Sequence, residues 1–159
     1  MADLVRPTDD GARRQAQRLF GTARHGALGV IDPASGAPQV SRVALRPDGA
    51  DLLMLVSTLS RHWAALEARP DCSLLLGEPG PEGDPLAAPR LTLAVRATMA
   101  QKEALKPEWL AWHPKAALYY DFADFRLMRL EVSHGFLVGG FGRAFELSRA
   151  DLENSKGPG

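Results

Sequence analysis

Residues 39–57 of the chain, QVSRVALRPDGADLLMLVS, decide its class of fold. Two apolar runs of strand length flank Pro47-Asp48-Gly49, and proline, aspartate and glycine in this order are typical of a tight turn. The pattern predicts an antiparallel hairpin with strands at 39–45 and 51–57.

Further strands are predicted on both sides of this hairpin, with helices between or beside them. Residues 91–99 alternate between apolar and more polar side chains over the length of a long strand. The glycine- and proline-rich residues 77–85 predict a surface loop before it. Short strands at hairpin-like spacing indicate a mainly β fold, an antiparallel barrel with peripheral helices. We expect strands also at 27–31, 72–76, 125–132, 135–139 and 144–147, and helices at 12–23, 58–68, 107–112 and 114–120.

The composition fits one globular domain. The chain has 159 residues, 19 basic against 19 acidic side chains, and 45% hydrophobic residues. That length suits a single core, so we place one domain at residues 1–150 and a disordered tail at 151–159. Balanced charge disfavours a nucleic-acid binder. No apolar run approaches the roughly 20 residues of a membrane span, and no secretory signal is evident, which predicts a cytoplasmic protein without a nucleic-acid or membrane partner.

Hydroxyl and basic side chains gather where the hairpin's second strand passes into a helix. The sequence there is Ser57-Thr58-Leu59-Ser60-Arg61-His62. A helix N-terminus offers free backbone N–H groups and the positive end of the dipole, which suit a phosphate. The alternative is ordinary capping by Thr58 or Ser60, with Arg61 and His62 in solvent. Because capping gives no reason for two basic groups in the first turn, we favour an anion site.

Arg42 is the second candidate residue. Alternation along the first hairpin strand places Val43 and Leu45 on one face and Arg42 on the other. Arg42 is either an exposed charge whose stem lies on the sheet or a ligand of an anion. The local sequence does not distinguish these two interpretations.

The other reactive side chains show no pattern of a site. The four histidines, His25, His62, His113 and His134, lack the paired spacing of a metal site, so we expect no metal. The single cysteine, Cys72, lies in an apolar strand and is expected to be inert.

Several stretches between residues 13 and 147 carry a family resemblance through their order and spacing. They are VSRVAL at 40–45, STLSRH at 57–62, LLLGEPG at 74–80, GDPL at 83–86, PRLTL at 89–93, HPKA at 113–116 and LVGGFGRA at 137–144. Together they resemble the pyridoxamine 5′-phosphate oxidase-like FMN-binding split barrels, and within these the haem-utilisation (HugZ-like) branch. The resemblance implies a six-stranded antiparallel split β-barrel and a homodimer with FMN at its interface.

By position, the resemblance also implies roles for individual residues. Arg42 to Leu45 would line the phosphate and flavin edge, and the hydroxyls of residues 57–60 would meet the ribityl–phosphate region. Arg61 and His62 would hold the phosphate. No residue is assigned a catalytic role. The implied cofactor-binding set is Arg42, Val43, Ala44, Leu45, Ser57, Thr58, Ser60, Arg61, His62, Arg90 and Phe141.

Three functions are consistent with these observations. The first is an FMN-dependent oxidoreductase that acts on a small molecule, in which the flavin supplies the electron chemistry. The second is a haem-binding protein on the same barrel, with His113 or His134 as the iron ligand. The third is a non-catalytic flavin-binding module. The chain lacks a C-terminal signature for pyridoxamine phosphate, and His134 is its last histidine, so we expect neither vitamin B6 oxidation nor haem oxygenase activity.

Overall fold

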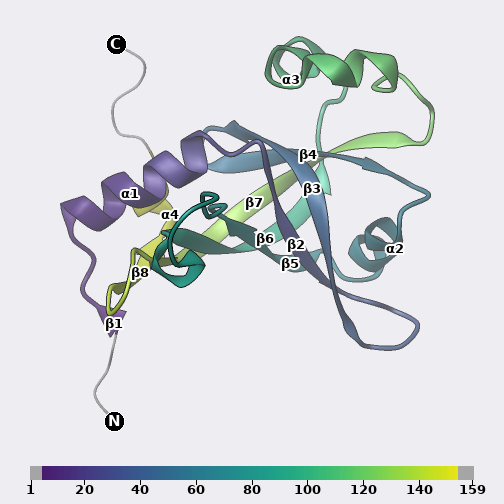
Figure 1. Ribbon diagram of the computed structural model, residues 1–159. Helices are drawn as coiled ribbons and strands as arrows, with labels where there is room; N and C mark the ends of the chain where they lie inside the picture. Colours follow the sequence, from purple (N-terminus) through teal and green to yellow (C-terminus); the bar gives the residue numbers. More distant parts are fainter. Residues whose placement is uncertain (1–4, 154–159) are drawn as a thin grey trace.

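A closed barrel of six antiparallel strands forms the centre of the molecule, in a computed structural model that describes residues 5–153. Around the barrel the strand order is β7-β4-β3-β2-β5-β6, and β6 pairs with β7 to close it (Figure 1). Strand β8 extends the sheet beyond β7, and β1 pairs with β8 in parallel. The strands are β1 (Val5–Arg6), β2 (His25–Ile31), β3 (Pro38–Asp48), β4 (Asp51–Ser57), β5 (Asp71–Leu76), β6 (Arg90–Met99), β7 (Phe125–Val138) and β8 (Ala144–Ser148).

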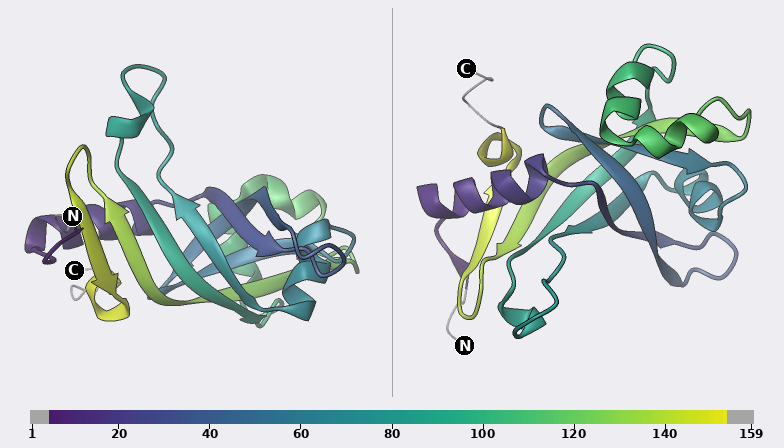
Figure 2. Two further views of the ribbon diagram at one scale, coloured as in Figure 1. Left: turned by 90° about the horizontal axis from the view of Figure 1, so that it is seen from below. Right: turned by 45° about the horizontal axis from the view of Figure 1, so that its top comes forward.

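Short helices connect and cover these strands. They are α1 (Asp10–Gly21), α2 (Arg61–Ala68), η1 (Pro85–Ala87), α3 (Lys106–Trp112), η2 (Pro114–Leu118) and α4 (Arg149–Leu152). Figure 2 shows the loop between β5 and β6 projecting away from the sheet, as its composition predicts. In the described residues, no helix is long and apolar enough to cross a membrane.

Alternation along the strands fills the barrel with aliphatic side chains. In β6, every second residue from Leu91 to Ala97 is buried, while Thr92 and Arg96 face outward. Neighbouring strands supply the rest of the interior, including Leu28, Leu45 and Leu74. Burial of this apolar surface is the main force that holds the barrel together. The predicted mainly β fold, an antiparallel split barrel with peripheral helices, is confirmed.

The barrel is split along β3. Residues 45–48 of this strand pair with β4, whereas residues 38–44 pair only with β2. Strand β4 instead follows β7 up to Ser57 and then passes into α2, which lies against β2. The predicted phosphate-binding residues therefore begin where β3 and β4 diverge.

Helices cover two sides of the barrel. Ala12, Ala16 and Phe20 of α1 pack into the main core, and Asp9 caps this helix by accepting a hydrogen bond from the Ala12 N–H. The α3–η2 segment covers the outer face of β4 and β7, where a second apolar cluster forms. That cluster consists of Leu53, Trp109, Ala116, Tyr120 and Leu127.

The closing strands differ from the sequence prediction. Residues 125–132 and 135–139 were expected as two strands, but β7 runs unbroken from Phe125 to Val138. Its register against β6 shifts at Ala94/Val95, and Ser133 is the extra residue. Such a β-bulge bends a strand without ending it. The strand therefore remains continuous through the bulge, and the side chains next to the bulge change direction.

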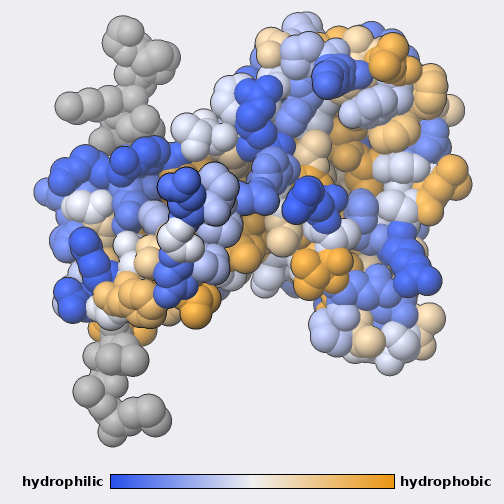
Figure 3. Space-filling model, in the orientation of Figure 1, coloured by the Kyte–Doolittle hydropathy of each residue, from blue (hydrophilic) through white to orange (hydrophobic). Residues whose placement is uncertain are grey.

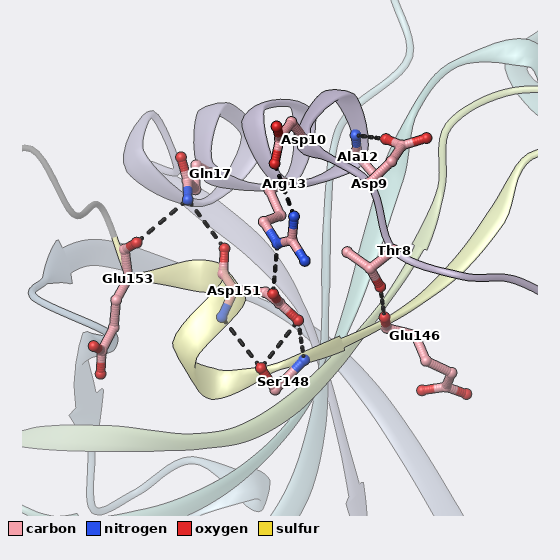
Figure 4. A network of polar contacts seen from close by, with 10 residues as sticks. All are labelled: Thr8, Asp9, Asp10, Ala12, Arg13, Gln17, Glu146, Ser148, Asp151 and Glu153. Atoms are coloured by element: carbon pink, nitrogen blue, oxygen red, sulfur yellow. Dashed lines mark hydrogen bonds and ion pairs between the residues drawn. The ribbon is translucent and has the colours of Figure 1, made fainter.

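The C-terminal boundary also differs from the prediction. Residues 151 and 152, expected in the tail, belong to α4, and Leu152 is buried in the main core. Arg13 of α1 donates from Nε to Asp151 Oδ1 at 2.7 Å, and Gln17 donates to the Asp151 carbonyl at 3.0 Å (Figure 4). Within α4, Ser148 and Asp151 form a reciprocal capping box. Residues 154–159 of the expected tail lie outside the described residues.

Candidate functional site

The hydroxyls before α2 are engaged in local structure. Ser60 is the N-cap: its Oγ accepts from the Trp63 N–H at 3.3 Å and donates to the Ser57 carbonyl at 2.6 Å. Ser57 Oγ donates to Asp124 Oδ2 at 2.6 Å, and the Thr58 N–H donates to the Asp124 carbonyl. The capping interpretation is therefore confirmed for Ser60, and Asp124, in the turn just before β7, holds the turn that precedes α2.

Arg61 and His62 lie at a cleft of about 250 Å³ beside β3. It is lined by these two residues and by Gln39, Val40 and Ser41. His62 Nδ1 lies 3.2 Å from Ser41 Oγ, and partial burial holds the pKa of the imidazole below its ordinary value. Arg61 is exposed in the first turn of α2. At neutral pH this cleft therefore offers one permanent positive charge and a neutral histidine.

Arg42 lies on the opposite face of β3 from Ser41. Its guanidinium projects to solvent and lies 3.8 Å from Glu78, which also approaches His25 Nε2 at 3.2 Å. These three residues surround a shallow groove of about 190 Å³. His25 and Glu78 were not predicted beside Arg42, because no local sequence pattern joins residues so far apart in the chain.

The other β3 residues of the predicted set point in two directions. The side chains of Val43 and Leu45 are buried in the barrel core. Ala44 faces outward under the α3–η2 segment. The Leu45 carbonyl lies 2.7 Å from His113 Nε2. Val43 and Leu45 can therefore reach an external ligand only through their backbone.

Arg90 and Phe141 are distant from the α2 cleft. Arg90 pairs with Val138 at the end of β7, whereas Ser57 pairs with Phe125 at its beginning. Thirteen residue steps along the bulged strand β7 separate these points, a length along the strand of roughly 40 Å. Arg90 donates to the Leu86 and Ala88 carbonyls at 2.9 and 3.3 Å, and Phe141 is 71% exposed. One chain thus does not bring the predicted cofactor-binding set into one site.

A larger cavity, of about 620 Å³, lies along β5, β6 and β7 next to the bulge. Arg149 at its edge forms a 2.5 Å ion pair with the buried Asp51, and the exposed Arg96 pairs with Asp71 at 3.2 Å. Burial raises the pKa of the Cys72 thiol to about 11, and Asp71 adds to this effect, so the thiol is largely protonated at neutral pH. The lining residues are Asp51, Asp71, Cys72, Ala94, Val95, Arg96, Glu131, Val132, Ser133 and Arg149.

No group of three or more histidine, cysteine, aspartate or glutamate residues within 5–153 is arranged to hold a metal ion. The iron of a bound cofactor is a separate case, because a protein can hold it with a single side chain.

Two curated proteins are similar to this chain in sequence. The non-canonical heme oxygenase HOZ of Arabidopsis thaliana is 35% identical over 130 residues, which cover 76% of this chain and 39% of that protein. The heme oxygenase HutZ of Vibrio cholerae is 29% identical over 134 residues, covering 79% of this chain and 74% of that protein. No family model matches the sequence.

Solved structures show the same architecture. A heme binding protein from Mycobacterium smegmatis superposes with a TM-score of 0.80 at 28% identity, over 93% of this chain and 61% of that one. A putative pyridoxamine 5′-phosphate oxidase from Listeria innocua superposes with a TM-score of 0.64 at 13% identity, over 80% and 98%. The chain belongs to the pyridoxamine 5′-phosphate oxidase-like split barrels, in the HutZ branch.

Membership of the HutZ branch confirms the resemblance seen in the sequence. The chain spans about two fifths of the plant relative's length and three quarters of HutZ. The likeness to the oxidase, at 13% identity, establishes the fold alone.

Proposed function

We propose that this HutZ-branch protein binds haem in the 620 Å³ cavity along β5, β6 and β7. The cavity supports the proposal through its volume and through the guanidinium groups of Arg96 and Arg149 at its edge, and its lining also includes the carboxylates of Asp51, Asp71 and Glu131. Haem is an apolar ring with two carboxylates, and pockets for such ligands are mostly apolar with a few placed polar groups. The names of HOZ, HutZ and the mycobacterial protein support the same ligand class.

The two arginines of the cavity differ in how firmly they are held. The Arg96–Asp71 pair is mostly exposed, and such pairs contribute only about 0–1 kcal/mol. Arg96 can therefore turn to a ligand carboxylate at small cost. Arg149 is bound by Asp51 and by the Val132 carbonyl, so it contributes mainly to the structure of the cavity wall.

Titration of the purified protein with hemin tests this proposal. We expect saturable binding with a shifted Soret band near 400 nm, the region of haem absorption. Arg96→Ala should weaken binding, whereas the control Arg18→Ala, in the last turn of α1, should leave it unchanged. A hemin spectrum that stays identical to that of free hemin would refute the proposal.

We also propose that a second copy of the chain covers the outer face of β2 and β3. Val40 is 74% exposed there, and Ile31 and Leu75 are 36% and 41% exposed on the same face. Figure 3 shows that hydrophobic residues are exposed among hydrophilic ones on the side of the molecule that it presents. Exposed apolar patches of this kind mark interaction surfaces. Val40→Asp should shift the molar mass measured by light scattering from dimer to monomer. Leu118→Asp, at an 80% exposed position of η2, is the matched control.

FMN is the second candidate cofactor, favoured by the cleft at the start of α2. Arg61, His62 and Ser41 would hold its phosphate there, next to the helix N-terminus. Flavin bound at this position would support an oxidoreductase acting on a small molecule. Absorbance bands near 370 and 450 nm would identify flavin, and their bleaching by NAD(P)H followed by recovery in air would show redox cycling. A protein that binds FMN without cycling is a flavin-binding module.

A further inference from the structure

The shallow groove of about 190 Å³ lies on the outer face of the sheet at the start of β2, next to the β5–β6 loop. Ala27 pairs with Arg42 of β3 on one side and with Leu75 of β5 on the other, so these three residues form one row across three strands. His25 precedes Ala27 by two residues and therefore lies on the same face. Ile31, in the proposed interface with a second copy, lies at the other end of β2.

A carboxylate of the protein itself lies across the two basic groups of this groove. Glu78 Oε1 is 3.8 Å from Arg42 Nη2, and Glu78 Oε2 is 3.2 Å from His25 Nε2. Each oxygen of one carboxylate therefore faces a basic group from a different strand. Basic groups that reach both oxygens of a carboxylate recognise its planar shape as well as its charge.

Glu78 is held weakly in this position. The side chains of Glu78 and Arg42 are 56% and 76% exposed, and ion pairs between exposed side chains contribute little to stability. A distance of 3.8 Å is too long for a hydrogen bond, and within residues 5–153 the Arg42 guanidinium donates no hydrogen bond. A carboxylate from outside the protein can therefore replace that of Glu78 at small cost and form the hydrogen bonds to Arg42 that Glu78 does not form.

We propose that this groove is a binding site for a small carboxylate, and that Glu78 occupies the site in the absence of the ligand. The carboxylate of the ligand binds Arg42 and His25 in place of Glu78, and its apolar part lies on Ala27 and Leu75. At roughly 30 Å³ for each water molecule, the groove holds about six waters, which suits a ligand of the size of benzoate. The site shares no lining residue with the α2 cleft or the 620 Å³ cavity, so it is independent of FMN and haem.

Titration of the protein with sodium benzoate, followed by NMR of the His25 ring at constant pH and ionic strength, tests this proposal. We expect saturable shifts in the wild-type protein. The affinity of Glu78→Gln should be higher by up to about fivefold, or about 1 kcal/mol, because the competing carboxylate is gone. Glu82→Gln removes the same charge from an exposed position of the same loop; it is the matched control and should bind as the wild type does.

Arg42→Gln in the Glu78→Gln background should abolish the saturable shifts. Circular dichroism of each variant establishes that it is folded. Equal affinity of the wild-type protein and Glu78→Gln would show that Glu78 does not occupy the site. Absence of saturable shifts in both proteins, or equal binding of benzoate and its neutral analogue benzamide, would refute carboxylate recognition. Inorganic phosphate is the third probe, and tighter binding of phosphate than of benzoate would show that the groove selects phosphate and that the proposal is wrong.

Discussion

Removal of the Asp51 carboxylate should destabilise the protein more than removal of any exposed acidic partner. Asp51 is 12% exposed, and its Oδ1 accepts from Arg149 at 2.5 Å and from the Val132 N–H at 3.1 Å. Arg129 lies 3.7 Å from Oδ2. Asp51→Ala leaves the Val132 N–H beside the bulge without this acceptor and removes the carboxylate that Arg149 and Arg129 share. Arg149 then keeps only the Val132 carbonyl and Glu153, and Arg129 keeps Asp48.

The expected loss is about 3 kcal/mol of unfolding free energy. Breaking a buried ion pair costs about 3–5 kcal/mol, and we take the lower end because Arg149 is partly exposed. For a domain of this size the loss corresponds to a decrease in Tm of about 6–12 °C. Asp71→Ala, which breaks the exposed pair with Arg96, is the control and should cost at most about 1 kcal/mol.

Urea denaturation of Asp51→Ala, Asp71→Ala, Arg149→Ala and the Asp51/Arg149 double variant measures these changes in the free energy of unfolding. A double-mutant cycle should give a coupling energy of about 1–3 kcal/mol between Asp51 and Arg149. A loss below about 1 kcal/mol for Asp51→Ala, together with a coupling energy near zero, would show that the pair is not a structural contact in solution.

The pH dependence of the Asp51→Ala effect provides an independent check. Burial alone would raise the pKa of Asp51, but the hydrogen bonds from Arg149 and Val132 outweigh it and hold the pKa below its ordinary value. A carboxyl group with a lowered folded-state pKa contributes stability above its unfolded pKa, and this contribution is lost as the pH falls through the folded pKa. The difference in unfolding free energy between wild type and Asp51→Ala should therefore be largest near pH 7 and should decrease as the pH is lowered into the acid range.

Four further predictions concern separate parts of the fold. Gly77→Ala should destabilise strongly, because Gly77 has φ +97° and an added Cβ would lie 2.5 Å from the Pro89 carbonyl oxygen; thermal unfolding measures this, with Gly80→Ala, in open space, as the control. Leu152→Ala should cost about 2–4 kcal/mol, because it removes a buried side chain that joins α4 to the core; an unchanged urea midpoint would mean that α4 is not docked. Cys72, whose thiol pKa is raised to about 11, should react with iodoacetamide at pH 8 far more slowly than free cysteine in the same solution. Arg61→Ala should weaken FMN binding by about 1.5–3 kcal/mol. The affinity of the wild-type protein for FMN should rise only in acid, where His62 with its lowered pKa gains a proton. Equal affinity of the wild-type protein and Arg61→Ala would show that the phosphate binds elsewhere.

The sequence was sufficient to predict most of the barrel. Apolar alternation and the turn residues between strands identified β2 to β6 and β8, because both signals arise from neighbours along the chain. The sequence left Thr58 and Ser60 as alternative N-caps of α2, and in the structure the N-cap is Ser60. The bulge at Ser133 was not predicted, because a bulge depends on the register with β6 and leaves no separate signal in β7.

Which side chains face the barrel interior and where the chain turns can be predicted from the sequence, since these features depend on periodicities of two to four residues. Which polar groups meet depends on how the whole chain folds. The fold paired Asp51 with Arg149, separated Arg90 from the α2 cleft along β7, and joined the bulged Ser133 to the Ala94 carbonyl. These contacts join residues on different strands, and strand register is fixed by packing of the whole core rather than by local sequence.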